Sequence, residues 1–361
     1  MQDETVSSGM RANRATIVDV ARLAGVSTAT AGRALGGYGQ VGKKSAASVR
    51  AAAQELGYHS NEVARSMRSG RTSTIGLVIA DISGSFFEQT TLAIVRTAAQ
   101  RGYHTLVLNT DEDLTAEADA VRVLLDKRVD GLIVVTSSRT GHDHLVNGGD
   151  LVAPLVFLDR RTEDVPACVV STEDRETARE AAKLFSELGH TRIGMLTTTS
   201  KLGGKLLPYD SKQAVSTMHD RVSGLLEGIA DAGLQLADNH LVYTDPDHNE
   251  AKTNAIRLLS GEERPTAVLA ANAETALAIM DACNELGLEV GTDVSIVAFD
   301  DPSWARLLTP SLSVVARPVY DLGAAAVEKL IVQMRGEHDR PDSLTLPATI
   351  ILRDSVGPPR T

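Results

Sequence analysis

The stretch ATIVDVARLAGVSTATAGRAL, residues 15–35, predicts two short helices joined by a tight turn. Thr16 and Asp19 form a capping pattern that opens a helix, which we expect to run to about Ala24. Apolar positions recur at helical spacing, so one side of this helix should be buried, with the stripe Ile17, Val20 and Leu23. Gly25 then breaks the helix, and a second one can begin after it.

The second helix should start at the N-cap candidate Ser27 and end near Leu35. Its small residues would let it pack closely against the first helix: Ala29, Ala31, Gly32 and Ala34. Such a pair reads DNA by placing the start of the second helix in the major groove. The expected contacts are the two cap residues and four on the second helix: Thr16, Ser27, Thr28, Ala29, Thr30 and Arg33, whose forked guanidinium matches O6 and N7 of guanine. The alternative is an ordinary pair of packed helices.

The charge is divided unevenly along the chain. The 361 residues carry 36 Lys and Arg against 47 Asp and Glu, a formal net charge of −11. Residues 1–72 hold ten of the basic residues and five of the acidic ones, which gives +5 and leaves −16 for the remainder. A small basic head on an acidic body is expected when one domain meets phosphate and the other avoids it.

Several segments exclude other classes of protein. The start MQDETVSSGM lacks the basic and apolar parts of a signal peptide, and we expect residues 1–14 to be a disordered lead-in. No apolar run approaches the ~20 residues of a membrane span, so no membrane partner is expected. Cys168 and Cys283 lie far apart, which argues against a disulfide framework and favours a reducing, cytoplasmic location.

After Arg71, short apolar runs alternate with amphipathic helical segments. This alternation predicts an α/β body with parallel sheets covered on both faces. Roughly 290 residues are too many for one such sheet, so we expect two doubly wound lobes, with ligands bound outside the carboxyl ends of the strands. The predicted strands are 75–81, 104–110, 131–136, 155–159, 192–197, 240–244, 266–272, 294–300 and 312–316.

Polar side chains follow four of these strands, where a cleft should lie. They are Asp81, the pair Asp159 and Arg160, Asn272, and Asp300. Ser85, Phe86 and Phe87 come just after the first strand, and aromatic faces beside carboxylates suit a sugar. We also favour the cleft for Trp304, the one tryptophan. The alternatives are Phe rings packed on the core, a structural Asp–Arg pair, and Trp304 at the crossover between lobes.

Residues 15–72 resemble the DNA-binding head of the LacI/GalR family of bacterial repressors, and ARSMRSG at 64–70 is similar to that family's hinge helix. The resemblance extends over about residues 15–355. It implies a helix-turn-helix domain at 15–60, a hinge and linker at 61–72, and an effector-binding and dimerisation domain at 73–361. It also implies lobes near 73–160 plus 302–328 and near 161–301 plus 329–361, with three crossings. The hinge adds expected DNA contacts at Asn61, Val63, Ala64, Arg65, Met67 and Arg68.

The resemblance implies a repressor that binds a pseudo-palindromic operator as a homodimer, or as a tetramer, under the control of a small effector. A pentose, a nucleoside or another sugar is expected in the cleft. In the family, the positions that match Phe86, Phe87, Asp159, Arg160, Asn272 and Asp300 contact the ligand, and Arg221 is a further expected contact. Three departures from the family stand out: Met67 where leucine is usual, Ala273 in place of an aspartate, and a long run at 197–214.

Enzyme patterns are weak in this chain. No glycine-rich loop of the dinucleotide or P-loop type follows a strand, and no serine sits in a nucleophile elbow. His142 and His144 could supply metal ligands, but we expect them in a solvated loop. No cofactor, metal or catalytic residue is therefore expected. The alternative is a sugar-binding protein or small-molecule enzyme of the same lobed architecture, and cleavage near Arg71 would discriminate the two by loss of operator binding.

Overall fold

The computed structural model describes residues 15–36, 39–58, 71–199, 201–202, 205–337 and 342–360. The chain divides into two compact units, Met1–Thr72 and Ser73–Thr361, called the head and the body below. The expected lead-in at 1–14 and the six expected hinge contacts (Asn61, Val63, Ala64, Arg65, Met67 and Arg68) lie outside the described residues.

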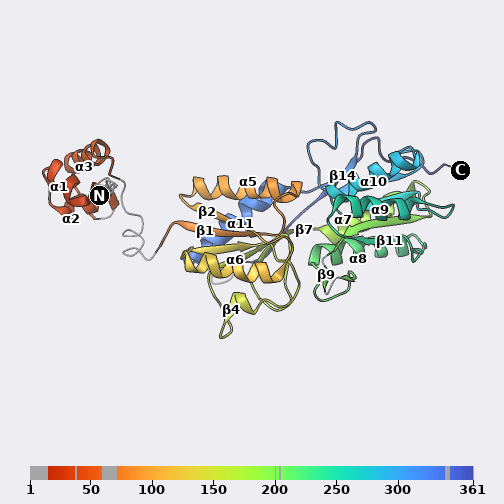
Figure 1. The fold of residues 1–361 in the computed structure, drawn as a ribbon, viewed down its shortest axis with the longest axis horizontal. Helices are drawn as coiled ribbons and strands as arrows, with labels where there is room; N and C mark the ends of the chain where they lie inside the picture. Colours follow the sequence, from red (N-terminus) through yellow and green to blue (C-terminus); the bar gives the residue numbers. More distant parts are fainter. Residues whose placement is uncertain are drawn as a thin grey trace, which may run out of the picture. The chain divides into compact units, whose positions relative to one another are not determined.

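The head contains three helices in its described part, α1 (Ile17–Leu23), α2 (Thr28–Gly36) and α3 (Lys43–Glu55) (Figure 1). The capping box predicted between Thr16 and Asp19 opens α1. The sequence pattern did not single out α3, which completes a small core through Val49. Leu23 was predicted to be buried and is 47% exposed, because the turn at Gly25 brings Val26 against the core instead.

The first sheet of the body is parallel throughout and is covered on both faces. Successive side chains of a strand point to opposite faces, so Leu77 meets α5 (Ser85–Gln100) and α11 (Val319–Met334), while Val78 meets α6 (Leu114–Asp126). Across the sheet the strands are β15 (Leu344–Leu346), β7 (Cys168–Thr172), β6 (Leu155–Leu158), β3 (Gly131–Val134), β1 (Thr74–Ile79) and β2 (His104–Asn109). A short turn η1 (Asp143–Leu145) and the hairpin of β4 (Val146–Asn147) and β5 (Asp150–Leu151) follow β3.

The second sheet has the same layered design, with β16 antiparallel to β14 and the other pairs parallel. Helices α7 (Asp174–Glu187) and α8 (Ser216–Asp231) cover one face, and α9 (His248–Leu259) and α10 (Ala273–Leu286) cover the other. The strand order is β11 (Leu241–Thr244), β8 (Ile193–Thr198), β12 (Ala267–Ala270), β13 (Ser295–Phe299), β14 (Ser313–Ala316) and β16 (Thr349–Ile351). The hairpin of β9 (Lys201–Leu202) and β10 (Lys205–Leu206) follows β8.

Helices α7 and α8 pack unusually closely, because α8 has glycines where they meet. A Cβ atom added at Gly224 would lie 2.0 Å from the carbonyl oxygen of Arg175, and one at Gly228 would lie 2.5 Å from that of Arg179. Both distances are far below van der Waals contact, so these positions require glycine. Helix α8 also carries Arg221, one turn before Gly224.

The fold class is confirmed, but the predicted lobe boundaries are wrong. The chain crosses between the lobes from β7 to α7, from β14 to α11, and from β15 to β16. Strands β7 and β15 were assigned to the second lobe and belong to the first sheet, whereas β14 was assigned to the first lobe and belongs to the second sheet. All of α11 packs in the first lobe. The apolar pattern of a buried strand suits either sheet, so local sequence does not reveal its pairing partner.

Within the described residues, no helix has the length and apolar character that crossing a membrane demands.

Candidate functional site

The exposed side of α2 carries the residues predicted to touch bases. Thr28, Ala29 and Arg33 are exposed and Thr30 is partly exposed, whereas Ala31 is buried against the other helices. The Oγ of Ser27 accepts a hydrogen bond from the backbone N–H of Thr30 at 3.1 Å, so Ser27 caps α2. The guanidinium of Arg33 donates to the hydroxyl of Thr30 at 3.4 Å. These contacts hold the polar side chains along one exposed strip of the helix, while Ala31 rather than Ala29 supplies the close packing.

A cavity of about 150 Å³ lies between the lobes of the body, at the carboxyl ends of the strands. Side chains from both sheets line it, as expected for this architecture. Eight of the predicted effector contacts are among them: Asp81, Phe86, Phe87, Asp159, Arg160, Arg221, Asn272 and Asp300. The sequence pattern missed other lining residues: Glu112, Thr197, Thr198, Thr217, Met218, Glu274 and Arg317.

Arg317 is the central missed residue, and its side chain is only 2% exposed. Its Nη1 donates to Asp159 Oδ1 at 2.7 Å, and its Nη2 lies 2.6 Å from Asp300 Oδ1, so it joins one carboxylate of each lobe. The guanidinium lies 3.6 Å from the centroid of the Phe86 ring. Burial alone would lower the pKa of Arg317, but Asp300 and Asp159 outweigh burial and raise the pKa, so the group stays charged. Arg317 directly follows the predicted strand 312–316, and this position is the sequence signal that could have identified it as a cleft residue.

Asp159 and Asp300 have matching backbone conformations. Their φ angles are 67° and 74°, in the left-handed region that is costly for a residue with a side chain. Each follows the last residue of a strand, β6 or β13, and each backbone N–H still bonds the neighbouring strand, at Val170 or Val315. Burial raises the pKa of Asp159 although Arg317 opposes it. The alternative of a structural Asp–Arg pair is therefore correct for both acids, except that the arginine is Arg317 and not Arg160.

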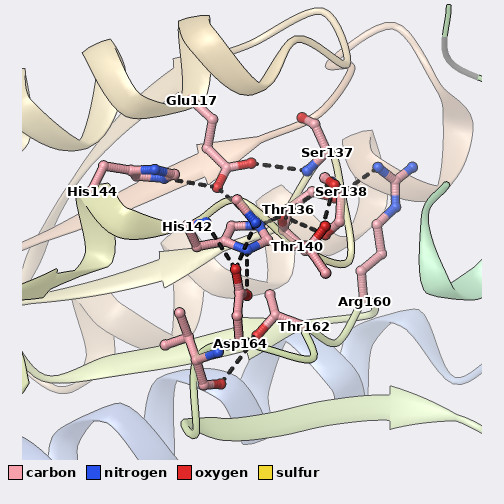
Figure 2. Close-up of polar contacts among 12 residues, drawn as sticks. Glu117, Thr136, Ser137, Ser138, Thr140, His142, His144, Arg160, Thr162 and Asp164 are labelled. Atoms are coloured by element: carbon pink, nitrogen blue, oxygen red, sulfur yellow. Dashed lines mark hydrogen bonds and ion pairs between the residues drawn. The ribbon is translucent and has the colours of Figure 1, made fainter. Parts of the chain in front are cut away.

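Arg160 turns away from Asp159 toward Glu112. Its Nη2 donates to Glu112 Oε1 at 2.7 Å. Its Nη1 donates to the carbonyl oxygen of Thr136 at 3.0 Å (Figure 2). The guanidinium also lies 5.6 Å from the ring centroid of Phe87. Its Nε is buried and has no hydrogen-bond partner among the described residues. A buried donor without an acceptor is costly.

Arg221 is held by an acid of its own lobe. Its Nε and Nη2 lie 2.8 and 2.7 Å from Asp174 Oδ2, and its Nη1 donates to the carbonyl oxygen of Ala271 at 2.6 Å. The guanidinium lies 4.1 Å from the ring centroid of Phe299. Burial would raise the pKa of Asp174, but the charges of Arg221 and Arg317 outweigh it and lower the pKa. Arg221 therefore reaches the cavity as a paired ion.

The remaining polar lining residues have few partners. Asp81 Oδ1 accepts from the N–H and the hydroxyl of Ser83, at 2.9 and 2.7 Å. Asn272 caps α10 and donates from Nδ2 to Thr198 Oγ1 at 3.3 Å. Glu274 Oε1 accepts from the N–H of Ser85 at 3.3 Å, which links the two lobes, and burial raises the pKa of Glu274.

Two predicted effector contacts, Ser85 and Trp304, are not among the residues that line the cavity. Trp304 packs against the core beneath α9 and α10, because the loop after β13 folds back on itself with a hydrogen bond from the Leu312 N–H to the Ala305 carbonyl. Ser85 is the first residue of α5, and its N–H is directed to Glu274. The preference for placing Trp304 in the cleft was therefore wrong.

The loop with His142 and His144 is a buried polar network and not a solvated loop (Figure 2). His142 is 1% exposed, with Nδ1 2.8 Å from Asp164 Oδ1 and Nε2 2.6 Å from Thr136 Oγ1. His144 Nε2 lies 3.1 Å from Oε1 of the fully buried Glu117 on α6. The partners are distant in sequence, which is why the loop looked solvated. No group of three or more candidate metal ligands occurs in the described part of the chain.

The long run at 197–214 takes part in contacts between the lobes. After the hairpin of β9 and β10, the carbonyl oxygen of Ser211 accepts a hydrogen bond from Arg139 Nη2 at 2.7 Å. Nearby, Arg161 of the first lobe pairs with Asp220 on α8, with Nη2 2.7 Å from Oδ1. These contacts join the lobes at places other than the bonds of Arg317.

Comparisons with known proteins agree with this arrangement. Residues 16–61 match the family described as bacterial regulatory proteins, lacI family, and residues 182–356 match the periplasmic binding protein-like domain. The ribose operon repressor of Halalkalibacterium halodurans is 30% identical over 342 residues, which cover 94% of this chain and 97% of that protein. The transcriptional repressor PurR of Photobacterium profundum is 28% identical over 344 residues, 95% of this chain and 98% of that protein.

The fold has a close counterpart among solved structures. A lac repressor dimer bound to operator and the anti-inducer ONPF aligns with a TM-score of 0.82 at 24% identity, over 96% of this chain and all of that one. The curated relatives are transcriptional regulators, so the alternative of an enzyme or a stand-alone binding protein is set aside. Together, the helix-turn-helix head, the two-lobed body and these relatives show that the chain belongs to the lacI family of bacterial regulatory proteins.

Proposed function

We propose that this regulator is a cytoplasmic repressor whose affinity for its operator is set by a small polyhydroxylated effector. The observation that carries the proposal is the cavity between the lobes, which has aromatic rings from Phe86 and Phe87 and polar groups from both sheets. Rings that face a sugar's C–H surface, with polar side chains on its hydroxyls, suit a pentose or a ribose-containing nucleoside. Hexoses and purine bases are the next candidates. The repressor of a ribose operon among the relatives supports a sugar.

The proposed division of labour follows the units of the chain. The helix-turn-helix domain at 15–60 reads the major groove, the hinge and linker at 61–72 bind the minor groove, and residues 73–361 bind the effector and dimerise. One short recognition helix reads too few base pairs for genomic specificity, so two copies should bind a pseudo-palindromic site. Exposed apolar side chains on α5 and β2 are available for a contact between bodies: Leu92, Val95 and Leu106.

Replacing Arg33 with alanine should weaken specific binding by about 1–3 kcal/mol, because a bidentate contact to guanine would be lost. Arg33 is exposed on α2, and its side-chain hydrogen bond within the described part of the head is the weak one to Thr30, so the folded head should tolerate the change. The affinity is measured by fluorescence anisotropy on an operator obtained by selection from random duplexes, and on an unrelated duplex.

The matched control is Arg50→Ala, since Arg50 is an exposed arginine on α3 whose side chain, among the described residues, bonds only to the carbonyl of Ala46 in its own helix. A lost phosphate contact there would weaken binding to both duplexes alike. Equal losses on the two duplexes for Arg33→Ala would remove Arg33 from base reading.

A thermal-shift panel tests the effector class. A ligand that binds only the folded body raises its melting temperature by mass action, with about 2.7 kcal/mol of stabilisation at a concentration of 100 times Kd. The panel contains neutral sugars, amino sugars, phosphosugars and nucleosides, each tested on the full chain. We expect a shift for at least one polyhydroxylated compound, and that compound should alter operator binding in the anisotropy assay. A panel without any response would contradict the proposed effector class.

A further inference from the structure

The cations that line the cavity are already neutralised by the protein. Arg160, Arg221 and Arg317 each make a contact of 2.7 Å or less with a carboxylate, from Glu112, Asp174, and Asp159 with Asp300 respectively. These bonds use the guanidinium forks in bidentate or bridging geometry, which is the strong form of the interaction. A phosphate or carboxylate ligand would have to compete with these acids and would approach them closely.

Arg317 also covers one face of the Phe86 ring. Its guanidinium lies over Phe86 and contacts Asp159 and Asp300, so one positive charge is shared by two carboxylates. One negative charge of this group is therefore left without a matching cation.

Two acids of the cavity lining have no cation beside them among the described residues. Asp81, from the first lobe, accepts hydrogen bonds from Ser83. Glu274, from the second lobe, accepts from the backbone N–H of Ser85. Buried or half-buried carboxylates are normally paired, and the raised pKa of Glu274 reflects its burial and the nearby charges of Asp300 and Asp81. The unmatched charge in the cavity is therefore negative.

The Phe87 ring gives the cavity an apolar surface. It lies beside the Arg160 guanidinium, and C–H groups of a sugar-like ligand can pack against it. Arg160 itself is 7% exposed, with its Nε shielded from solvent and its other nitrogens bonded to Glu112 and Thr136. The cavity thus presents an aromatic face for C–H groups and two acids for a positive charge.

We propose that the effector is a cationic polyol, a sugar-like molecule whose protonated amine binds Asp81 and Glu274 while its C–H groups pack against Phe87. This inference rests on the proposed function, since it specifies the ligand class of the same cavity. An ammonium group would satisfy the carboxylates from both lobes at once, which a neutral sugar does only through hydroxyl hydrogen bonds. Anionic sugars should be rejected, because the described residues that line the cavity offer them no unpaired cation.

The test compares ligands that share a skeleton and differ in charge. Isothermal titration of the full chain is done with glucose, glucosamine and glucose 6-phosphate, and with the matching galactose series, at about pH 6.5, where a simple amino group is protonated. In at least one series the amino sugar should bind about tenfold more tightly than its neutral parent, which corresponds to about 1.4 kcal/mol, and the phosphate should not bind. The proposal is overturned if the neutral sugar or the sugar phosphate binds most tightly in both series. It is also overturned if neither amino sugar binds. The wider thermal-shift panel decides separately whether the cavity binds a small polyhydroxylated compound at all.

A matched pair of variants assigns the charge to its residue. Glu274→Gln keeps an oxygen that can accept from the Ser85 N–H but removes the charge, so it should weaken the amino sugar about tenfold and the neutral parent less than about twofold. The control Glu88→Gln removes an exposed carboxylate on α5 and should change neither. Asp81→Asn should behave like Glu274→Gln. Equal weakening of the amino and neutral sugars by Glu274→Gln would show that the residue acts by joining the lobes and would overturn its role as the counter-charge.

Discussion

Replacing Arg317 with methionine should destabilise the body by about 3–5 kcal/mol at neutral pH, the usual cost of removing one partner of a buried ion pair. Methionine keeps much of the side-chain volume but leaves Asp159 and Asp300 buried without their cation. The free energy of unfolding is measured by urea denaturation of the full chain, followed by circular dichroism. A loss below about 1 kcal/mol would contradict the view that these carboxylates depend on Arg317.

The penalty should depend on pH in a defined direction. The pKa of Asp159 is already raised by burial, and loss of Arg317 removes an effect that opposes the rise. A carboxyl group with a raised folded-state pKa binds its proton more readily when folded, so the cost of the substitution should shrink as the pH falls through that pKa. The matched control is Arg179→Met, which breaks an exposed pair with Asp231 and should change the free energy of unfolding far less than Arg317→Met at any pH.

Replacing Gly224 with alanine should cost about 3 kcal/mol, the upper end of what overpacking usually costs. The new Cβ would lie 2.0 Å from a backbone oxygen of α7, which cannot rotate away as a flexible side chain could. Helices α7 and α8 must therefore separate, and the second lobe should unfold at a lower temperature. The measurement is the melting temperature of the full chain by differential scanning calorimetry.

Ser223→Ala is the control for this change, because Ser223 is the preceding residue of α8 and is partly exposed. It should cost less than about 0.5 kcal/mol. If Gly224→Ala melted at the temperature of the unchanged chain, the two helices would not be as close as the structure places them.

Local sequence signals predicted the elements of this fold well. The capping box at Thr16 and the N-cap at Ser27 each depend on residues three positions apart, and both are present. Nine predicted strands correspond to β1, β2, β3, β6, β8, β11, β12, β13 and β14, since a run of apolar residues is itself a local property. The pairing of β7 and β15 is not local, because it joins residues more than 170 positions apart. That is why the lobe boundaries were misplaced.

The cavity could be located from sequence, but its chemistry could not. Polar residues that follow parallel strands lie at the carboxyl edge of their sheet, so Asp81 and Asp159 of the first lobe and Asn272 of the second were expected at the cleft. Which acid meets which arginine depends on side-chain paths across the cleft. Arg160 is next to Asp159 in sequence yet bonds Glu112, while Asp159 bonds Arg317, 158 residues away. Trp304 was misplaced because its rarity says nothing about the turn of the loop that carries it.

Arg317 lies on the second of the three crossings, immediately after β14 and two residues before α11. Any rotation that draws the lobes apart must lengthen its bond to Asp159 or its bonds to Asp300. The strength of these bonds therefore enters the equilibrium between open and closed bodies before any effector arrives, and a ligand can shift that equilibrium only by its differential affinity for the two states. Arg317 thus contributes to the effector concentration at which the regulator responds half-maximally. A substitution at Arg317 would shift the dose–response curve along the concentration axis, even for an effector that does not contact this residue.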